Sequence, residues 1–377
     1  MNRHAPPAVR PVVTGVGVLS AAGEGTTALA EAVVHGKTAF GTVTRFDVSA
    51  RRTTRAALLP EPRPLADAVL AAVDQACRRA GLAAAGPDTD PDAGPPVLLA
   101  LHSDLRTRAT LAAVTAGTTA GWGGPGVVRA YTGACVAAGT AVADAAALVS
   151  TGRRKRVLVA AGHLVEPGVF AAFDAGRALA RDGELRPFST GRSGTLLGDA
   201  AVAVLVEAAP EAERRGAPVL ARLAGWGRAG DAHHVCRPEP GGDGVARAIE
   251  AALGRAGVAP EEVGYVNANG TGSTLSDHAE ALALHRVFGA HTARLPVSSS
   301  KAVHGHALEA SALLELAVTI GALTDGLLPV NAGWLGPDPD IDLDLVLDGP
   351  RAARPRYALT LNSAFGGANT ALLVAAR

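Results

Sequence analysis

Cys135 is the residue of this chain best placed to act as a nucleophile. It lies in the segment 131–139 (YTGACVAAG), where small residues begin a helical pattern. We expect a helix to begin at Cys135. The unpaired N–H groups and the positive dipole of a helix start would then favour a thiolate over a thiol. The same N–H groups could stabilise an oxyanion. The alternative interpretation is a buried, unreactive cysteine, which is common in helices.

The segment 266–273 (VNANGTGS) is a first polar cluster in the second half of the chain. An expected strand ends there in a glycine-rich turn that carries Asn269, and a helix with Asp277 and Glu280 follows. Such turns expose backbone and hydroxyl groups to a ligand. Taken alone, an ordinary loop accounts for this pattern equally well.

The segment 298–309 (SSSKAVHGHALE) is a second cluster, in which Lys301 precedes His306 by five residues. A lone histidine at a helix start is more often structural than catalytic. We expect a helix from Gly305, and a helix start lowers the pKa of an imidazole, so that the ring of His306 stays neutral.

The segment 361–369 (LNSAFGGAN) is a third cluster, with Ser363, Phe365, Gly366 and Gly367. Two adjacent glycines before a strand would allow a main-chain amide to face a substrate.

The elements that must position these residues alternate between strands and helices, which indicates an α/β fold with buried sheets. We expect strands at residues 12–18, 95–101, 156–161, 200–208, 218–225, 263–268, 357–361 and 370–375, and helices at residues 26–35, 65–80, 135–150, 244–256, 276–288 and 305–323.

The two halves of the chain show similar spacing. Gly198 follows Cys135 by 63 residues and Gly367 follows His306 by 61, and each glycine precedes an apolar strand. This indicates a duplicated α/β unit, with halves at residues 1–209 and 210–377 whose helix starts face one site.

Composition excludes several classes of protein. Apolar residues make up 48% of the 377 residues and the net charge is zero, so nothing indicates a nucleic-acid-binding protein. The three cysteines are too far apart for a disulfide framework or a zinc site, so we expect no metal. The N-terminus has no apolar leader and no segment is suited to span a membrane, which predicts a cytoplasmic protein. The basic run 153–156 could meet an acidic partner protein, although a solvated loop is the simpler interpretation.

In this order, the clusters resemble the β-ketoacyl synthase family of the thiolase fold over nearly the whole chain. Cys135 matches the nucleophile, residues 269–273 (NGTGS) stand where the family has HGTGT, and residues 301–306 match its K…GH element. Further matches are residues 14–17 (TGVG), 45–47 (RFD), 186–188 (RPF), 192–194 (RSG) and 198–200 (GDA).

The resemblance implies a five-layer αβαβα architecture built from two halves. It implies that Cys135 takes an acyl group from the phosphopantetheine arm of an acyl carrier protein or of coenzyme A, with no separate cofactor. It also implies a pantetheine tunnel touched by Thr271 and Ser273, supporting positions for Asp277 and Glu280, and a homodimer or a heterodimer with another ketosynthase-fold chain.

The chain departs from the family pattern at three places. Asn269 replaces the first histidine, and losing one well-placed donor typically reduces a rate by ~10²–10³, so acyl capture should survive while decarboxylative condensation suffers. Ser363 stands where we align the gating phenylalanine, two positions before Phe365, and its amide is expected to complete the oxyanion hole with that of Cys135. The stretch 99–127 is shorter than its family equivalent.

Two functions follow. The first is an acyltransferase in polyketide or fatty-acid-type biosynthesis that forms acyl-Cys135. Lys301 would position His306 or hold a carboxylate through water, and Asn269 would orient the thioester carbonyl. The acyl acceptor would be a carbanion, or a hydroxyl, amine or thiol. The alternative is a non-catalytic subunit resembling a chain-length factor. Thiolase-like cleavage is a third reading, but its second active cysteine is not evident. The missing third glycine after 14–17 argues against a dinucleotide site.

Overall fold

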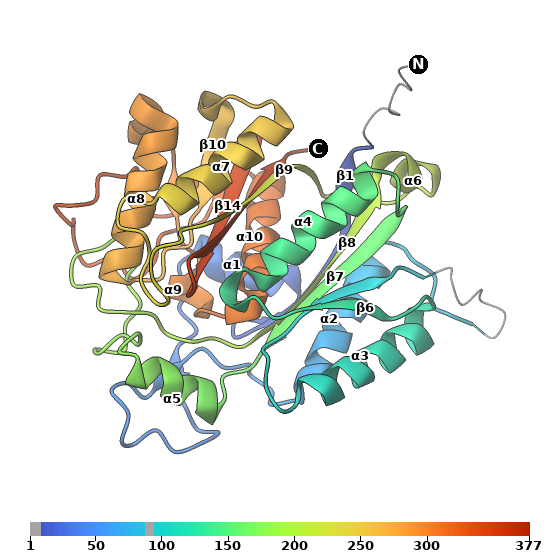
Figure 1. Cartoon of the computed structure of the whole chain (residues 1–377), viewed down its shortest axis with the longest axis horizontal. Helices are drawn as coiled ribbons and strands as arrows, with labels where there is room; N and C mark the ends of the chain where they lie inside the picture. Colours follow the sequence, from blue (N-terminus) through green and yellow to red (C-terminus); the bar gives the residue numbers. More distant parts are fainter. Residues whose placement is uncertain (1–8, 87–93) are drawn as a thin grey trace.

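The computed structural model describes residues 9–86 and 94–377, so segments 1–8 and 87–93 lie outside the description. The described chain folds around one large mixed sheet with helices on its outer faces and between its two wings (Figure 1).

The first wing has the strand order β6-β5-β7-β8-β1. Its outer strands β5, β6 and β7 run parallel, and β8 is antiparallel to both β7 and β1. Valine-rich runs buried on both faces explain why these segments form strands. The bounds are β1 (Pro11–Ser20), β5 (Val97–Ala100), β6 (Val127–Tyr131), β7 (Arg156–His163) and β8 (Ala200–Ala208).

The second wing repeats this order and these directions as β11-β10-β14-β15-β9. The wings join where β1 and β9 pair at Val12 with Arg222 and Val13 with Ala221. The strand order therefore repeats as a duplicated unit would, while the boundary at 209/210 stays a prediction. The bounds are β9 (Ala221–Gly230), β10 (Val263–Asn267), β11 (Val297–Ser298), β14 (Tyr357–Ala364) and β15 (Ala368–Ala375).

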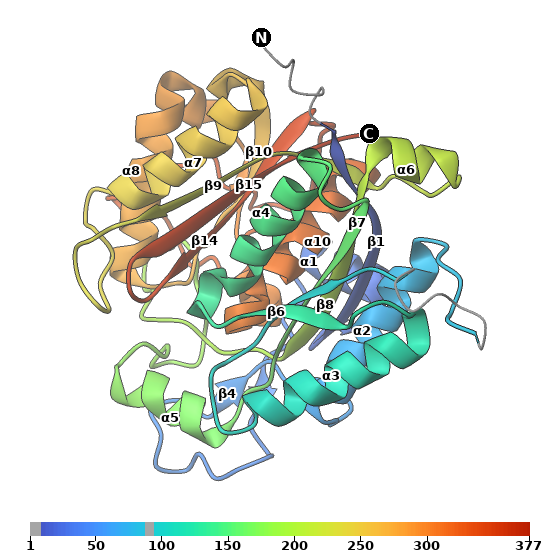
Figure 2. The ribbon, with the colours of Figure 1, turned by 45° about the vertical axis from the view of Figure 1, so that its right-hand side comes forward.

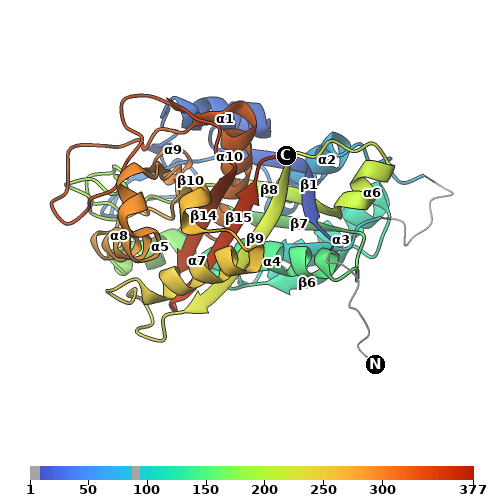
Figure 3. The same cartoon turned by 90° about the horizontal axis from the view of Figure 1, so that it is seen from above.

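Helices complete the layers seen in Figures 1 and 2. One pair packs on the first wing, another on the second, and a third fills the space between the wings, as the view from above shows (Figure 3). This is the predicted αβαβα architecture. The three pairs are α2 (Leu65–Arg79) with α3 (Thr107–Trp122), α7 (Asp243–Ala256) with α8 (Thr274–Phe288), and α4 (Ala137–Ser150) with α10 (Ser311–Asp325).

Small residues allow helices to pack at short distance against the strands of the sheet. A Cβ at Gly15 or Gly17 of β1 would lie 2.0 or 1.9 Å from the carbonyl oxygens of Ala76 and Ala72 in α2. The glycines of the TGVG segment thus allow a helix to press on a strand, a packing role.

The two central helices begin later than predicted. A 3₁₀ turn, η1 (Ala134–Val136), precedes α4, and a matching turn, η4 (Leu308–Ala310), precedes α10. Each turn starts with a non-glycine residue at positive φ, 51° at Ala134 and 40° at Leu308. The expected helix starts at Cys135 and Gly305 are therefore wrong, because the chain makes a tight turn before each helix.

Other predicted bounds shift by a few residues, and α3, β6 and α5 (Pro167–Ala175) were not predicted. The remaining elements are α1 (Gly25–Val34), which packs on α10, and β2 (Gly23–Glu24), β3 (Gly41–Thr42), β4 (Arg55–Ala56), α6 (Ala209–Arg214), η2 (Pro260–Glu262), η3 (Gly289–Arg294), α9 (Lys301–His304), β12 (Leu327–Leu328) and β13 (Arg351–Ala352). Among the residues described, no helix combines the length and apolar character needed to cross a bilayer.

Candidate active site

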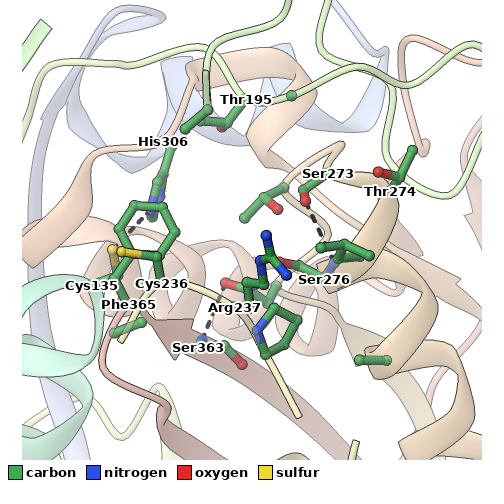
Figure 4. Close-up of a pocket in the computed structure, with 18 of the residues that line it drawn as sticks. Cys135, Thr195, Cys236, Arg237, Ser273, Thr274, Ser276, His306, Ser363 and Phe365 are labelled. Atoms are coloured by element: carbon green, nitrogen blue, oxygen red, sulfur yellow. Dashed lines mark hydrogen bonds between the residues drawn. The ribbon is translucent and has the colours of Figure 1, made fainter. Parts of the chain in front are cut away.

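The thiol of Cys135 and the imidazole of His306 meet where the two halves join. The Sγ atom of Cys135 lies 3.0 Å from Nε2 of His306, and Figure 4 shows the two side chains facing each other. Main-chain bonds hold His306 in place: its N–H donates to the carbonyl of Leu196 at 2.7 Å, and its carbonyl accepts from Gly198 at 3.0 Å. Sequence-distant segments are thus tied together directly at the site.

Both members of this pair are neutral. Burial raises the pKa of Cys135 to about 12, with the Glu309 carboxylate adding to the rise and Lys301 opposing it. Burial therefore opposes the expected thiolate, since Cys135 is only 6% exposed and precedes α4. Burial holds the pKa of His306 well below its usual value, and the positive charge of Lys301 lowers it further. The predicted neutral imidazole agrees in direction, although burial is its main cause.

Ser311 fixes the way in which His306 can act. Its Oγ lies 3.0 Å from Nδ1 of His306. When Nδ1–H donates to Ser311, Nε2 carries the lone pair that can take the proton of Cys135. Ser311 was not identified from sequence, where it stands as one more small residue in an apolar helix.

Lys301 makes no hydrogen bond to His306 in the described part of the chain, although its charge lowers the pKa of that imidazole, so its expected role stays a prediction. Its Nζ lies 2.5 Å from Oε1 of Glu315 and 3.3 Å from Oδ1 of Asn269, and Lys301 and Glu315 are fully buried. Asn362 donates to the other oxygen of Glu315 at 2.6 Å. Sequence reasoning missed Glu315, although a carboxylate inside a strongly apolar helical segment was a signal for a buried ion pair.

The side chain of Asn269 is oriented by two donors. Its Oδ1 accepts from Lys301 and from the backbone N–H of Ser363 at 3.3 Å. Its Nδ2 makes no hydrogen bond within the described part of the chain, and Asn269 lines the pocket, so this amide is free to donate to a ligand. The backbone N–H of Ser363 thus donates to Asn269 here, and the oxyanion role expected of it stays a prediction.

The glycine-rich segment 365–367 forms the turn between β14 and β15. Gly366 and Gly367 have φ of 88° and 75°. The N–H of Gly366 donates to Val235 at 2.7 Å, and the carbonyl of Gly367 accepts from Asp231 at 2.7 Å, so these groups fix the loop. Phe365 is 51% exposed and lines the pocket beside Cys135, with its ring 5.7 Å from that of Phe173 in α5.

A cavity of about 360 Å³ leads to Cys135 and His306, and Thr271 and Ser273 line it, while their contact with pantetheine stays a prediction. Ser273 also caps α8 by accepting from the N–H of Ser276 at 3.5 Å. Cys236 and Arg237 line the same cavity and were missed, because an exposed loop carries no motif for them (Figure 4).

Asp277 and Glu280 hold the 269–272 loop from below. Glu280 accepts from the N–H groups of Asn269 at 2.7 Å and Gly270 at 2.8 Å, and Asp277 accepts from Gly272 at 3.2 Å. Burial raises the pKa of Asp277 to about 6 and that of Glu280 to about 7. Both carboxyl groups therefore face backbone rather than the cavity.

Asp199, the central residue of the 198–200 segment, fixes the neighbouring loops. Its carboxylate accepts from the N–H groups of Val165 at 2.6 Å and Leu59 at 2.8 Å and pairs with Arg45. Arg45 is the arginine of the 45–47 motif.

Across residues 9–86 and 94–377, no group of three or more histidine, cysteine or acidic side chains could hold a metal ion.

A duplicated αβαβα fold, with a cysteine of one half against a histidine of the other, defines a thiolase-like protein. Residues 100–212 match the family model described as beta-ketoacyl synthase, N-terminal domain, and residues 220–334 match the beta-ketoacyl synthase, C-terminal domain. The chain belongs to the beta-ketoacyl synthase family.

Curated relatives and solved structures agree with this assignment. Nodulation protein E of Rhizobium meliloti is 39% identical over 250 residues, which are 66% of this chain and 61% of that protein. The 3-oxoacyl-[acyl-carrier-protein] synthase 2 of Coxiella burnetii is 37% identical over 189 residues, 50% of this chain and 46% of that protein. The match thus spans about six tenths of nodulation protein E and less of the synthase.

Among solved structures, the ishigamide ketosynthase/chain length factor superposes with a TM-score of 0.89 at 27% identity. A beta-ketoacyl synthase from Burkholderia phymatum STM815 superposes with a TM-score of 0.84 at 26% identity. Each comparison covers 98% of this chain and 100% of the other.

Proposed function

We propose that this protein is a ketosynthase-type acyltransferase of polyketide or fatty-acid-type biosynthesis that carries its acyl group on Cys135. The observation that supports this most is the 3.0 Å contact between Sγ of Cys135 and Nε2 of His306 at the end of a cavity lined by Thr271 and Ser273. The donor is a thioester of phosphopantetheine, on an acyl carrier protein or on coenzyme A.

The acylation step uses the neutral pair. As Sγ of Cys135 attacks the thioester carbonyl, its proton passes to Nε2 of His306. The carbon–sulfur bond to pantetheine then breaks, and His306 returns the proton to the departing thiolate. Asn269 donates from Nδ2 to the carbonyl oxygen, where negative charge develops.

The second step depends on the acceptor. Decarboxylation of a malonyl thioester needs stabilisation of an enolate, and this site offers one imidazole and one amide for it. Carbon–carbon bond formation is then slower than in a site with two histidines, whereas transfer to a hydroxyl, amine or thiol needs no enolate.

A non-catalytic partner subunit, resembling a chain-length factor, is the second candidate. Asn269 in place of a histidine favours it, and one structural neighbour is described as a ketosynthase/chain length factor. The ordered contact between Cys135 and His306 favours the first candidate, because a silent subunit has no need of it.

An acyl carrier protein, and a second ketosynthase-fold chain in a homodimer or heterodimer, are the proposed partners. The basic run 153–156 offers a carrier protein three exposed cations, Arg153, Arg154 and Lys155. Arg156 is excluded from this set, since it binds Glu211 at 3.0 Å.

Intact-mass measurement tests the acyl-enzyme. Wild-type protein incubated with acetyl-coenzyme A should gain one acetyl group, and Cys135→Ala should gain none. Cys236→Ala is the matched control, because Cys236 is exposed in the same cavity and should not be needed. A wild-type protein that gains no mass, or a gain that persists in Cys135→Ala, would favour the silent subunit.

A further inference from the structure

A second cavity, of about 710 Å³, lies behind the active site near the start of α3 and the end of β7. Its lining includes His102, His163 and Val169. Val169 of α5 also packs against the apolar cluster that contains Cys135. A layer of side chains that includes Val169 therefore separates the second cavity from the apolar cluster of Cys135.

Glu309 lies in that layer. Its neighbour Leu308 belongs to the same apolar cluster as Cys135. Its own carboxylate reaches the histidines of the second cavity, with Oε1 2.8 Å from Nδ1 of His102 and Oε2 3.4 Å from Nδ1 of His163. Glu309 and His163 are each 2% exposed. A charged cluster therefore stands between the reactive sulfur and the larger space.

Glu309 stays ionised there. The hydrogen bond with His102 and the nearby imidazole of His163 hold the pKa of Glu309 well below its usual value against the effect of burial, and the bond to Glu309 raises the pKa of His102. Nε2 of His163 and Oε2 of Glu309 have no hydrogen-bond partner among the residues described. Any apolar group inserted here would displace the histidines and leave a buried carboxylate unpaired, which is strongly unfavourable.

The room on the Cys135 side of this cluster is small and apolar. Val165, Phe170 and Leu197 belong to the same apolar cluster as Cys135, and all of them are buried. An acyl group on Cys135 that extends away from the cavity of Thr271 and Ser273 meets these side chains first and the carboxylate of Glu309 next.

We propose that Glu309, His102 and His163 form a charged floor that restricts the acyl group on Cys135 to short chains by closing the way into the second cavity. This inference rests on the proposed acyl-enzyme and deepens it, since it names the class of acyl group. Removing the charges and the bulk together should join the two spaces and admit a longer alkyl chain.

Rates of acylation at Cys135 by acetyl- and octanoyl-coenzyme A, followed by intact mass on the full chain, test the floor. In the wild type we expect octanoyl transfer to be at least ~10-fold slower than acetyl transfer, since its chain must desolvate a carboxylate. The double variant Glu309→Ala/His163→Ala should raise the octanoyl rate about 10-fold and change the acetyl rate less than about 2-fold, because it removes the buried carboxylate together with the buried histidine beside it.

Glu309→Gln is the second variant, which keeps the shape, removes the charge and decides the question if the double variant does not fold. It should raise the octanoyl rate about 3-fold. His291→Ala is the control, because this half-buried histidine binds the carbonyl of Val263 and lines neither cavity. Equal wild-type rates for both thioesters, or no octanoyl gain in either variant, would overturn the floor. A wild type that accepts neither thioester would instead count against the proposed acyl-enzyme.

Discussion

The thiol of Cys135 and the imidazole of His306 form a neutral hydrogen-bonded pair, held by burial on one side and Ser311 on the other. Proton transfer inside this pair must then accompany attack on the substrate. The pair differs in this respect from cysteine–histidine sites that rest as a thiolate and an imidazolium. Reactivity toward reagents that attack only the thiolate reports the difference.

Alkylation of Cys135 by iodoacetamide should rise roughly tenfold per pH unit from about pH 6 to about pH 10, because only the thiolate reacts and its pKa lies above this range. Intact mass over time, with Cys236→Ala and Cys77→Ala removing the other thiols, gives the rate. A plateau below about pH 8 would mean that the thiol is ionised in the resting protein.

Asn269→His should raise malonyl decarboxylation by ~10²-fold, since it restores a second imidazole beside His306 for the enolate. The release of carbon dioxide from a malonyl thioester, with circular dichroism to verify folding, measures the effect. Asn269→Ala is the control that removes the amide donor without supplying an imidazole. Unchanged release in a folded Asn269→His protein would show that this asparagine does not limit the reaction.

At the scale of elements, the segment between residues 196 and 198 carries the histidine into place. Leu197 forms a parallel bridge with His306, and Gly198 lies so close that a Cβ there would be 2.1 Å from the carbonyl oxygen of His304. No side chain fits in that gap without moving backbone. The position of the imidazole thus depends on a glycine that touches no substrate.

Gly198→Ala should lower the rate of Cys135 acylation by at least ~10-fold and destabilise the fold by about 1–3 kcal/mol, because the 304–306 backbone must move away. Acylation rates and urea unfolding measure the two effects. Gly168→Ala is the matched control, since a Cβ there meets nothing within 4 Å. Equal behaviour of the two variants would contradict the packing argument.

At the scale of the whole molecule, two copies of one topology place their central helices, α4 and α10, back to back between the wings. One copy supplies Cys135 and the other His306, so neither half has a complete site. The first wing ends at β6, whose outer edge pairs with no strand among the residues described. Val128 on this strand is 50% exposed.

The chain should self-associate along β6, because an exposed edge strand with apolar side chains is a template for pairing. Val128→Lys should shift the mass seen by light scattering from dimer to monomer. Leu335→Lys is the control, because it makes the same change from an exposed aliphatic residue to lysine at a residue that is 65% exposed and lies outside β6. A dimer that persists in Val128→Lys would exclude this edge, and a monomeric wild type would point to a heterodimer.

The sequence pattern predicted those elements whose structure depends on residues close together in the chain. The strands at Val12 and Ala200, the apolar helix after His306 and the glycine turn before β15 all follow from local pattern, because a buried strand or helix must present apolar side chains in its own period. The 3₁₀ turns before α4 and α10 do not, because their backbone is held by contacts with the opposite half.

The order of residue types along the chain therefore determined the family resemblance, the duplicated α/β pattern and the identity of Cys135, Asn269 and His306 as candidates. Only the tertiary structure decided that burial raises the pKa of the thiol, that Lys301 binds Glu315 and Asn269, and that Glu309 pairs with His102 and His163. The reason is physical: burial and charge pairing depend on which distant side chains share a space, and local sequence contains no measure of that distance.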